Sequence, residues 1–217
     1  MKFGQNRRRG RCDPETKHET EVQPILPLQF DDEIDSFLTR TRRLLLVGEI
    51  DEISSTYICS HLQMLACEKK PIYLYINSVG GCLSSGYAII DQMLACDCPV
   101  HTIVRGQAQS MGALIAAFGE KGYRYSTPNS LMMLHSILIQ SPSEPIEKHM
   151  AMMNYIHRDY REKIINLAKR LKLTSKELLN AMDDTQWMSP KQAIAVGMID
   201  KIWTPRMERA VNRELKK

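Results

Sequence analysis

The sequence predicts an α/β fold with a largely parallel, buried sheet. Apolar runs alternate with amphipathic, helix-like stretches along the chain, which is the order expected of strands joined by helices. The 217 residues, of which 43% are hydrophobic, suffice for one sizeable domain. No apolar run approaches the roughly 18 residues of a membrane span, so we expect a soluble protein with no membrane partner.

The elements follow one another in a regular order. Strands are expected at 43–50, 72–76 and 100–104, and helices at about 54–67, after Ser84 and over 110–118. Residues 123–135 then predict a strand pair around the turn-forming Pro128 and Asn129. After this pair the pattern changes to a long helix.

A helix at about 142–171 is predicted from a capping box and an apolar stripe. Ser141, Pro142 and Glu144 form the box, with proline at the first helical position. The stripe recurs at steps of three and four and needs a partner surface: Ile146, Met150, Met153, His157, Tyr160, Ile164, Leu167 and Leu171. Later helix ends are marked by Thr174 with Glu177, Ser189 with Gln192, and Gly197.

The two ends of the chain differ from its middle. Residues 1–28 predict a flexible arm, 29–204 the folded domain and 205–217 a basic tail. The net charge of +4 comes partly from arginines and lysines at these ends, without interleaved aromatic residues, so we expect no nucleic-acid partner. The start lacks the apolar centre of a secretory signal.

Six cysteines show neither a pairing framework nor metal-ligand spacing, and we expect free thiols in a reducing compartment. Cys96 and Cys98 could bind a metal with His101, but small buried apolar side chains explain them better, so no metal and no cofactor are predicted.

Ser110, in GQAQSMGA (106–113), follows a strand and precedes an apolar helix. Such a serine is commonly an N-cap, yet the Met111 amide at the helix start also suits a developing oxyanion. The glycines of INSVGG (76–81) free backbone amides that could hold an oxyanion or simply reverse the chain. The sequence alone therefore leaves two roles for Ser110, a helix cap or a nucleophile.

His135 ends the next strand and is a plausible base for Ser110. A third group would have to orient its imidazole, and Asp183 and Asp184 follow the long helix. A structural histidine and a solvated loop are the alternatives.

These motifs together resemble the proteolytic subunit of the Clp protease family, over roughly residues 36–203. The resemblance includes IYLYINSVGG, Gly86, Asp91, GQAQSMGA, KGYRYSTPNSLMMLH, the long helix and WMSPKQAIAVGMIDKI. It implies a crotonase-like α/β fold with a long protruding handle helix, heptameric rings stacked as a tetradecamer, and an ATP-dependent unfoldase (Clp ATPase) as partner. The substrates would be unfolded polypeptides.

The resemblance assigns roles residue by residue. Ser110 would be the nucleophile, His135 the general base, and the amides of Gly81 and Met111 the oxyanion hole. Tyr73 and Tyr75 match aromatic residues of the pocket that receives unfoldase loops. The compartment would be the cytoplasm, with an organelle matrix or plastid stroma as alternatives.

Several positions depart from the family pattern. Thr185 stands where the family has its triad acid, so Asp184, one residue early, is the expected third residue, with Asp183 or none as alternatives. Val79 replaces a proline, Gln109 an alanine, and SILIQSPSEP (136–145) replaces a glycine-rich strand. Polar residues also occupy apolar positions of the docking pocket: Arg105 and Thr127.

Three functions compete on this basis. The first is an active ATP-partnered serine endopeptidase, and the second is a catalytically weak structural subunit of a mixed ring, which the missing acid favours. The third, a crotonase-fold enzyme acting on acyl-CoA, is opposed by the serine and histidine within the matched motifs.

Overall fold

The computed structural model describes residues 32–137 and 145–214. Its helices are α1 (Asp32–Arg40), α2 (Glu52–Leu65), α3 (Leu83–Ala95), α4 (Met111–Ala117), α5 (Ile146–Arg170), α6 (Ser175–Asp183), α7 (Pro190–Val196) and α8 (Pro205–Glu214). Its strands are β1 (Arg43–Ile50), β2 (Ile72–Gly81), β3 (Val100–Gln109), β4 (Arg124–Ser126), β5 (Leu131–Leu134), β6 (Gln186–Met188) and β7 (Lys201–Ile202). The predicted α/β class is confirmed.

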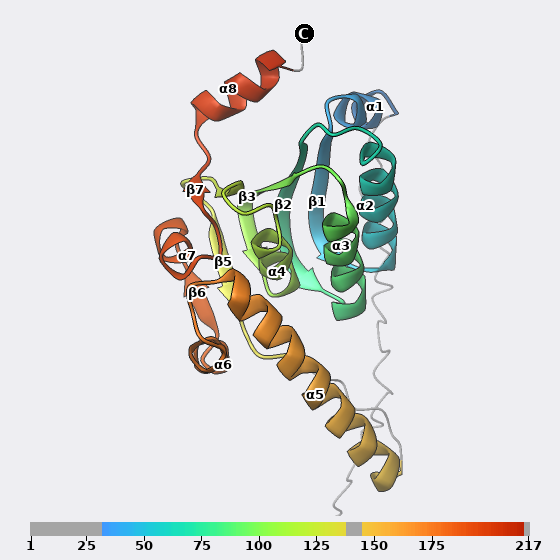
Figure 1. Cartoon of the computed structure of the whole chain (residues 1–217), viewed down its shortest axis with the longest axis vertical. Coiled ribbons are helices and arrows are strands. Elements are labelled where there is room, and N and C mark those ends of the chain that lie inside the picture. Colours follow the sequence, from blue (N-terminus) through green and yellow to red (C-terminus); the bar gives the residue numbers. More distant parts are fainter. Residues whose placement is uncertain (1–31, 138–144, 215–217) are drawn as a thin grey trace, which may run out of the picture.

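The strands form one seven-stranded sheet in the order β1-β2-β3-β4-β7, with β5 paired to β3 and β6 paired to β5 (Figure 1). All pairs are parallel except β5 with β6. Because the strands are parallel, their carboxyl ends share one edge, and there β2, β3 and β5 deliver the motifs singled out in the sequence.

The expected strand pair over 123–135 is not a pair. β4 and β5 both run parallel to β3, β4 against residues 102–104 and β5 against residues 107–109. The turn at Pro128 and Asn129 therefore shifts the chain along β3 instead of folding it back. That shift carries β5 to the carboxyl end of β3, where Ser110 begins the next helix.

Both faces of the sheet are covered, by different elements. Alternate side chains of a strand point to opposite faces. Ile72, Leu74 and Ile76 belong to the main core, on the face where α2, α3 and α4 pack. Tyr73 and Tyr75 point the other way, into a second buried cluster that includes Trp203 and Val211 of the C-terminal segment.

The predicted caps explain where several helices begin and end. Thr174 with Glu177 and Ser189 with Gln192 form reciprocal capping boxes, as expected. Gly197 ends α7 in the left-handed conformation, with φ of +81°. The Ser141 box lies outside the described residues, and α5 is described from Ile146 onward.

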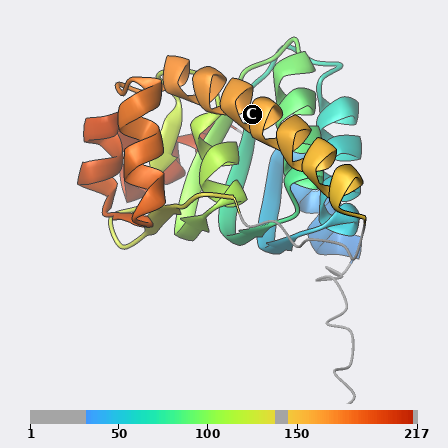
Figure 2. The ribbon, with the colours of Figure 1, turned by 90° about the horizontal axis from the view of Figure 1, so that it is seen from below.

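The long helix α5 projects from the body of the molecule (Figure 1). Seen from below, it crosses in front of the other elements, from α6 and α7 toward α1 and α2 (Figure 2). Its C-terminal part is packed, with Ile164, Leu167 and Ala168 buried, whereas Ile146 and Met150 are 73% and 60% exposed. Within one chain, the first two positions of the predicted apolar stripe are therefore largely uncovered.

The ends of the chain differ from one another. The expected N-terminal arm lies outside the described residues, and the domain is described from Asp32 in α1. Where we expected a basic tail, the structure has α8, whose Val211 is buried against the sheet. None of the helices in the described parts of the chain is both long and apolar enough to cross a membrane.

Candidate active site

Ser110 stands in a sharp turn between β3 and α4. Its backbone φ is +49° and its ψ is −120°, a conformation that a residue with a side chain rarely adopts. Its amide donates to the Met133 carbonyl of β5, which fixes the turn to the sheet. The hydroxyl makes no capping bond to α4, although Ser110 occupies the N-cap position. The turn therefore presents the hydroxyl away from the helix.

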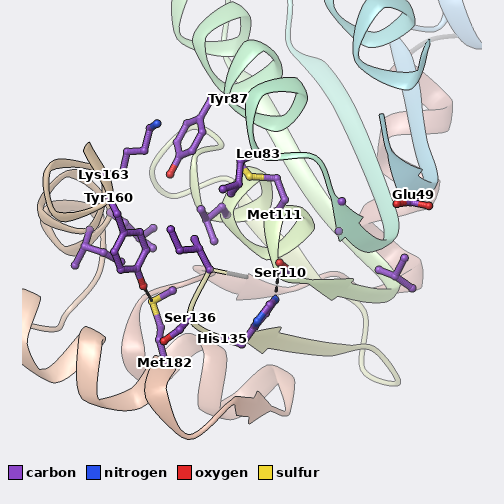
Figure 3. A pocket seen from close by; sticks show the side chains of 17 residues that line it. Glu49, Leu83, Tyr87, Ser110, Met111, His135, Ser136, Tyr160, Lys163 and Met182 are labelled. Carbon is purple, nitrogen blue, oxygen red and sulfur yellow. Dashed lines mark hydrogen bonds between the residues drawn. The ribbon is translucent and has the colours of Figure 1, made fainter. Parts of the chain in front are cut away.

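The hydroxyl points instead to His135. Ser110 Oγ and His135 Nε2 are 2.9 Å apart, which is a hydrogen bond between a potential nucleophile and a potential base (Figure 3). His135 follows β5, and Ser110 follows β3, so the parallel pairing of these strands sets the two side chains at one edge. The structure thus brings together the serine and the histidine expected to form the site.

The glycines of β2 bring its carboxyl end against Ser110. A Cβ atom on Gly80 would lie 2.8 Å from Ser110 Cβ, and one on Gly81 would lie 2.3 Å from the Ile50 carbonyl oxygen. Both glycines have positive φ values, +92° and +149°. The glycine pair therefore serves close approach of the backbone, which leaves Gly81 on the wall of the same cavity as Ser110 and Met111.

Met111 begins α4 directly after Ser110, and the first amides of a helix have no acceptor within the helix. Its side chain is buried and faces Gly86 of α3, where an added Cβ would lie 2.1 Å from Met111 Cγ. Packing against Gly86 therefore fixes Met111, whose amide was expected to contribute to an oxyanion hole.

A cavity of about 310 Å³ opens beside Ser110 and His135 (Figure 3). Its walls are mainly apolar and come from α3, α4, α5 and α6: Leu83, Tyr87, Leu114, Tyr160, Ile164, Leu167 and Met182. The volume is sufficient for a large side chain of a bound polypeptide.

The sequence did not point to the polar part of this cavity. Lys163 Nζ lies 4.4 Å from the centre of the Tyr87 ring and donates to Asp159 one turn earlier, at 2.5 Å. Burial, with the nearby Asp159 charge, raises the pKa of Tyr87 to about 12. Only the spacing of Asp159 and Lys163 could have been read from the sequence, because Tyr87 lies on another helix.

The third group of the site is the least defined. Among the described residues, the His135 side chain makes one hydrogen bond, to Ser110 Oγ. Asp183 Oδ1 accepts from Ser136 Oγ at 3.0 Å, and Asp184 is the exposed residue directly after α6. Thr185 follows with φ of +52°, directly before β6.

The other residues singled out lie away from this site. Tyr73 and Tyr75 are 8% and 4% exposed on the outer face of the sheet, beneath the C-terminal segment. His101 stacks on Tyr123 with 4.3 Å between ring centres, and Cys98 is a buried free thiol. Within residues 32–137 and 145–214, no three His, Cys, Asp or Glu side chains are grouped to hold a metal.

This arrangement agrees with a comparison against known protein families. Residues 29–206, most of the chain, match the profile described as Clp protease. The matched range contains the strands, the long helix and both members of the serine–histidine pair. The chain therefore belongs to the Clp protease family, whose members are peptidases with a crotonase-like α/β fold and a handle helix.

Proposed function

We propose that this chain is a serine endopeptidase subunit that cleaves unfolded polypeptides inside a ring-shaped assembly. The observation that carries the proposal is the 2.9 Å contact between Ser110 Oγ and His135 Nε2 at a strained turn. Strain of this kind persists where the surroundings enforce it, and it is concentrated at functional sites.

The proposed chemistry follows from these positions. His135 Nε2 takes the proton of Ser110 as Oγ attacks the scissile carbonyl, and the amides of Gly81 and Met111 stabilise the oxyanion. The imidazolium then gives its proton to the leaving amine, and water completes hydrolysis of the acyl-enzyme by the same groups. Asp184 is our candidate for the residue that orients His135.

The apolar cavity supports a preference for substrates with a large apolar side chain at the cleaved bond. Tyr87 and Tyr160 supply aromatic walls, and Lys163 the polar one. Such a pocket discriminates by about 1–3 kcal/mol per methylene group, so the preference should be graded and not absolute.

Assembly and partner are also parts of the proposal. The exposed Ile146 and Met150 on α5 support an oligomer in which another copy covers them, as heptameric rings stacked in pairs would allow. An ATPase of the Clp type is the proposed unfoldase, with Tyr73 and Tyr75 in its docking surface. The unpaired thiols described support a reducing compartment, whether cytoplasm, organelle matrix or plastid stroma.

A second candidate function has its own supporting observation. No carboxylate among the described residues is hydrogen-bonded to His135, and a threonine stands at the family's acid position. These facts favour a catalytically weak structural subunit of a mixed ring.

Labelling with a fluorophosphonate separates the two functions. An activated Ser110 should react covalently, with mass added to the peptide that contains residue 110, and Ser110→Ala should abolish the labelling. Active chymotrypsin treated in parallel verifies the reagent. A folded chain that stays unlabelled would support the structural subunit.

A further inference from the structure

The outer face of the sheet is an aromatic surface that α8 covers. Its side chains are 8% exposed or less and come from β2, β3, β4 and the segment after β7: Tyr73, Tyr75, Ile103, Tyr125 and Trp203. From α8, Val211 is buried in this cluster and Met207 packs at its margin. The rest of α8 is strongly polar, so two apolar side chains provide its hydrophobic contact with the sheet.

Polar contacts of Glu208 and Asn212 hold α8 on this surface, and Asn212 Oδ1 accepts from Arg43 Nη2. Glu208 Oε2 accepts from Trp203 Nε1 at 2.8 Å and from Arg105 Nη2 at 2.9 Å. The Tyr75 hydroxyl lies 3.2 Å from both carboxylate oxygens, and Arg43 Nη2 lies 3.8 Å from Oε1. Hydrogen bonds of this kind, with one ionised partner or two, are stronger than neutral ones.

Three of the four donors are built into the sheet, and the fourth, Trp203, follows β7. Arg43 lies on β1, Tyr75 on β2 and Arg105 on β3, and the Arg105 guanidinium stacks over the Tyr75 ring at 4.4 Å. Among the described residues, Arg43 Nε is buried without a hydrogen-bond partner, so this donor set is not saturated. The sheet thus presents a preformed carboxylate site beside an apolar one.

The helix that occupies this site is weak on its own. It has ten residues, and isolated helices shorter than about 12–15 residues are marginal in water. Its order therefore depends on its contacts with the sheet and with Trp203, which are made by Glu208, Asn212, Met207 and Val211. Loss of the Glu208 charge should loosen the helix without disturbing the core on the other face.

We infer that the outer sheet face is a docking surface for a peptide segment with a carboxylate and, three residues later, an aliphatic side chain, and that α8 occupies it in cis. A segment of that chemistry in trans gains access only when α8 is displaced. The overlap with the ATPase docking surface, through Tyr73 and Tyr75, rests on the proposed function. The occupation by α8 rests on the contacts above.

The test uses the full chain with Glu208→Gln, and Arg209→Gln as the matched control, because Arg209 is an exposed neighbour on α8. Hydrogen exchange of the α8 amides should be about tenfold faster or more in Glu208→Gln, since the Gln side chain loses the charge that Arg105 and Arg43 bind. Exchange in Arg209→Gln should match the wild type.

A labelled synthetic peptide with the sequence of residues 204–214 then probes the surface in trans. By fluorescence anisotropy, it should bind Glu208→Gln about tenfold more tightly than the wild type, whose own α8 competes. The same peptide carrying the Glu208→Gln change should bind more weakly to both. Unchanged exchange of α8 in Glu208→Gln, or equal peptide binding by the two proteins, would overturn the inference. Hydrogen exchange and peptide binding do not require peptidase activity. The docking inference can therefore fail while the proposed function holds, or hold while the proposed function fails.

Discussion

Leu134 and Gln186 form the last described pair of the antiparallel ladder between β5 and β6. Continued by one residue, this register sets His135 opposite Thr185, the position where the family has its acid. On this register a hydroxyl stands where the family has a carboxylate, and Thr185 itself leaves the extended conformation, with φ of +52°. Asp184 is adjacent, at the end of α6.

We predict that Asp184→Asn lowers kcat/KM for a short fluorogenic peptide by roughly a thousandfold, because a neutral amide neither fixes the imidazole tautomer nor stabilises the imidazolium. Asp183→Asn is the matched control. Its carboxylate accepts from Ser136, so this change should leave turnover within a few fold of the wild type.

A different pattern would contradict this role. If Asp184→Asn keeps wild-type turnover while Thr185→Asp raises it, the natural site works as a serine–histidine pair, and the position opposite His135 is the one that can hold an acid.

Gly80 provides a second prediction at the site. Gly80→Ala should abolish turnover, because the added Cβ would lie 2.8 Å from both Ser110 Cβ and the Gln109 carbonyl oxygen. Gly122→Ala is the control, since Gly122 has a similar φ of +89° but nothing within 4 Å of an added Cβ. Both variants carry a backbone cost of about 1–2 kcal/mol. Loss of turnover in a folded Gly80→Ala protein, together with wild-type turnover in Gly122→Ala, fits the steric argument, and wild-type turnover of Gly80→Ala would contradict it.

The exposed part of α5 leads to a prediction about assembly. Met150→Asp should shift the protein to smaller species in analytical ultracentrifugation, because a charge would be buried where another copy covers the helix. The fold of one chain should not suffer, since Met150 is 60% exposed within it. Lys148→Asp changes the charge on another exposed position of the same helix and is the control. If the wild-type protein sediments as a stable monomer, no second copy covers α5, and the prediction is wrong.

Much of the fold could be predicted from local sequence signals. The bounds of β1, 43–50, coincide with an apolar run, and the caps at Thr174 and Ser189 lie in their expected places, because these depend on neighbouring residues alone. The relation of β4 to β5 could not be predicted, since both strands gain their hydrogen bonds from β3, which lies far away along the chain.

The candidate site also has a part that the sequence could predict and a part that it could not. Ser110 and His135 stand at strand ends, and parallel pairing was enough to expect them together. Lys163 and Tyr87 meet across two helices, so no local pattern could predict their contact. The cover over Tyr73 and Tyr75 also escaped prediction, because α8 is polar and is ordered by tertiary contacts more than by its own propensity.

The ion pair between Arg124 and Asp200 predicts a loss of stability. Arg124 is 3% exposed, and Asp200 accepts from its Nε, Nη2 and backbone amide and from the Gly122 amide. Asp200→Asn leaves the guanidinium charge buried without its counterion and should lower the free energy of unfolding by about 3 kcal/mol. Asp97→Asn, at an exposed position, should change it by less than about 0.5 kcal/mol. Urea denaturation measures both, and a similar small effect of the two changes would show that the pair contributes little.

The last prediction concerns His101 and acid pH. Burial lowers the pKa of His101 from 6.5 to about 4. The ring stacks on Tyr123 and meets the edge of Tyr73, and no charged side chain is among these ring partners. As pH falls below about 6.5, the unfolded chain binds this proton before the folded chain does, so His101 stabilises the fold above that pH and loses this contribution on the way to pH 4.

His101→Phe keeps an aromatic ring in the stack and removes the titrating group. Its free energy of unfolding should therefore fall less steeply than that of the wild type between about pH 6.5 and 4, whereas the two curves should run parallel above about pH 7. Asp200, whose pKa is held below 3.8 because hydrogen bonds from Arg124 outweigh burial, is present in both proteins, so its own acid dependence cancels in the comparison. Urea unfolding at a series of pH values tests the prediction, and equal slopes of the two proteins across the acid window would show that His101 is protonated in the folded chain as readily as in the unfolded one.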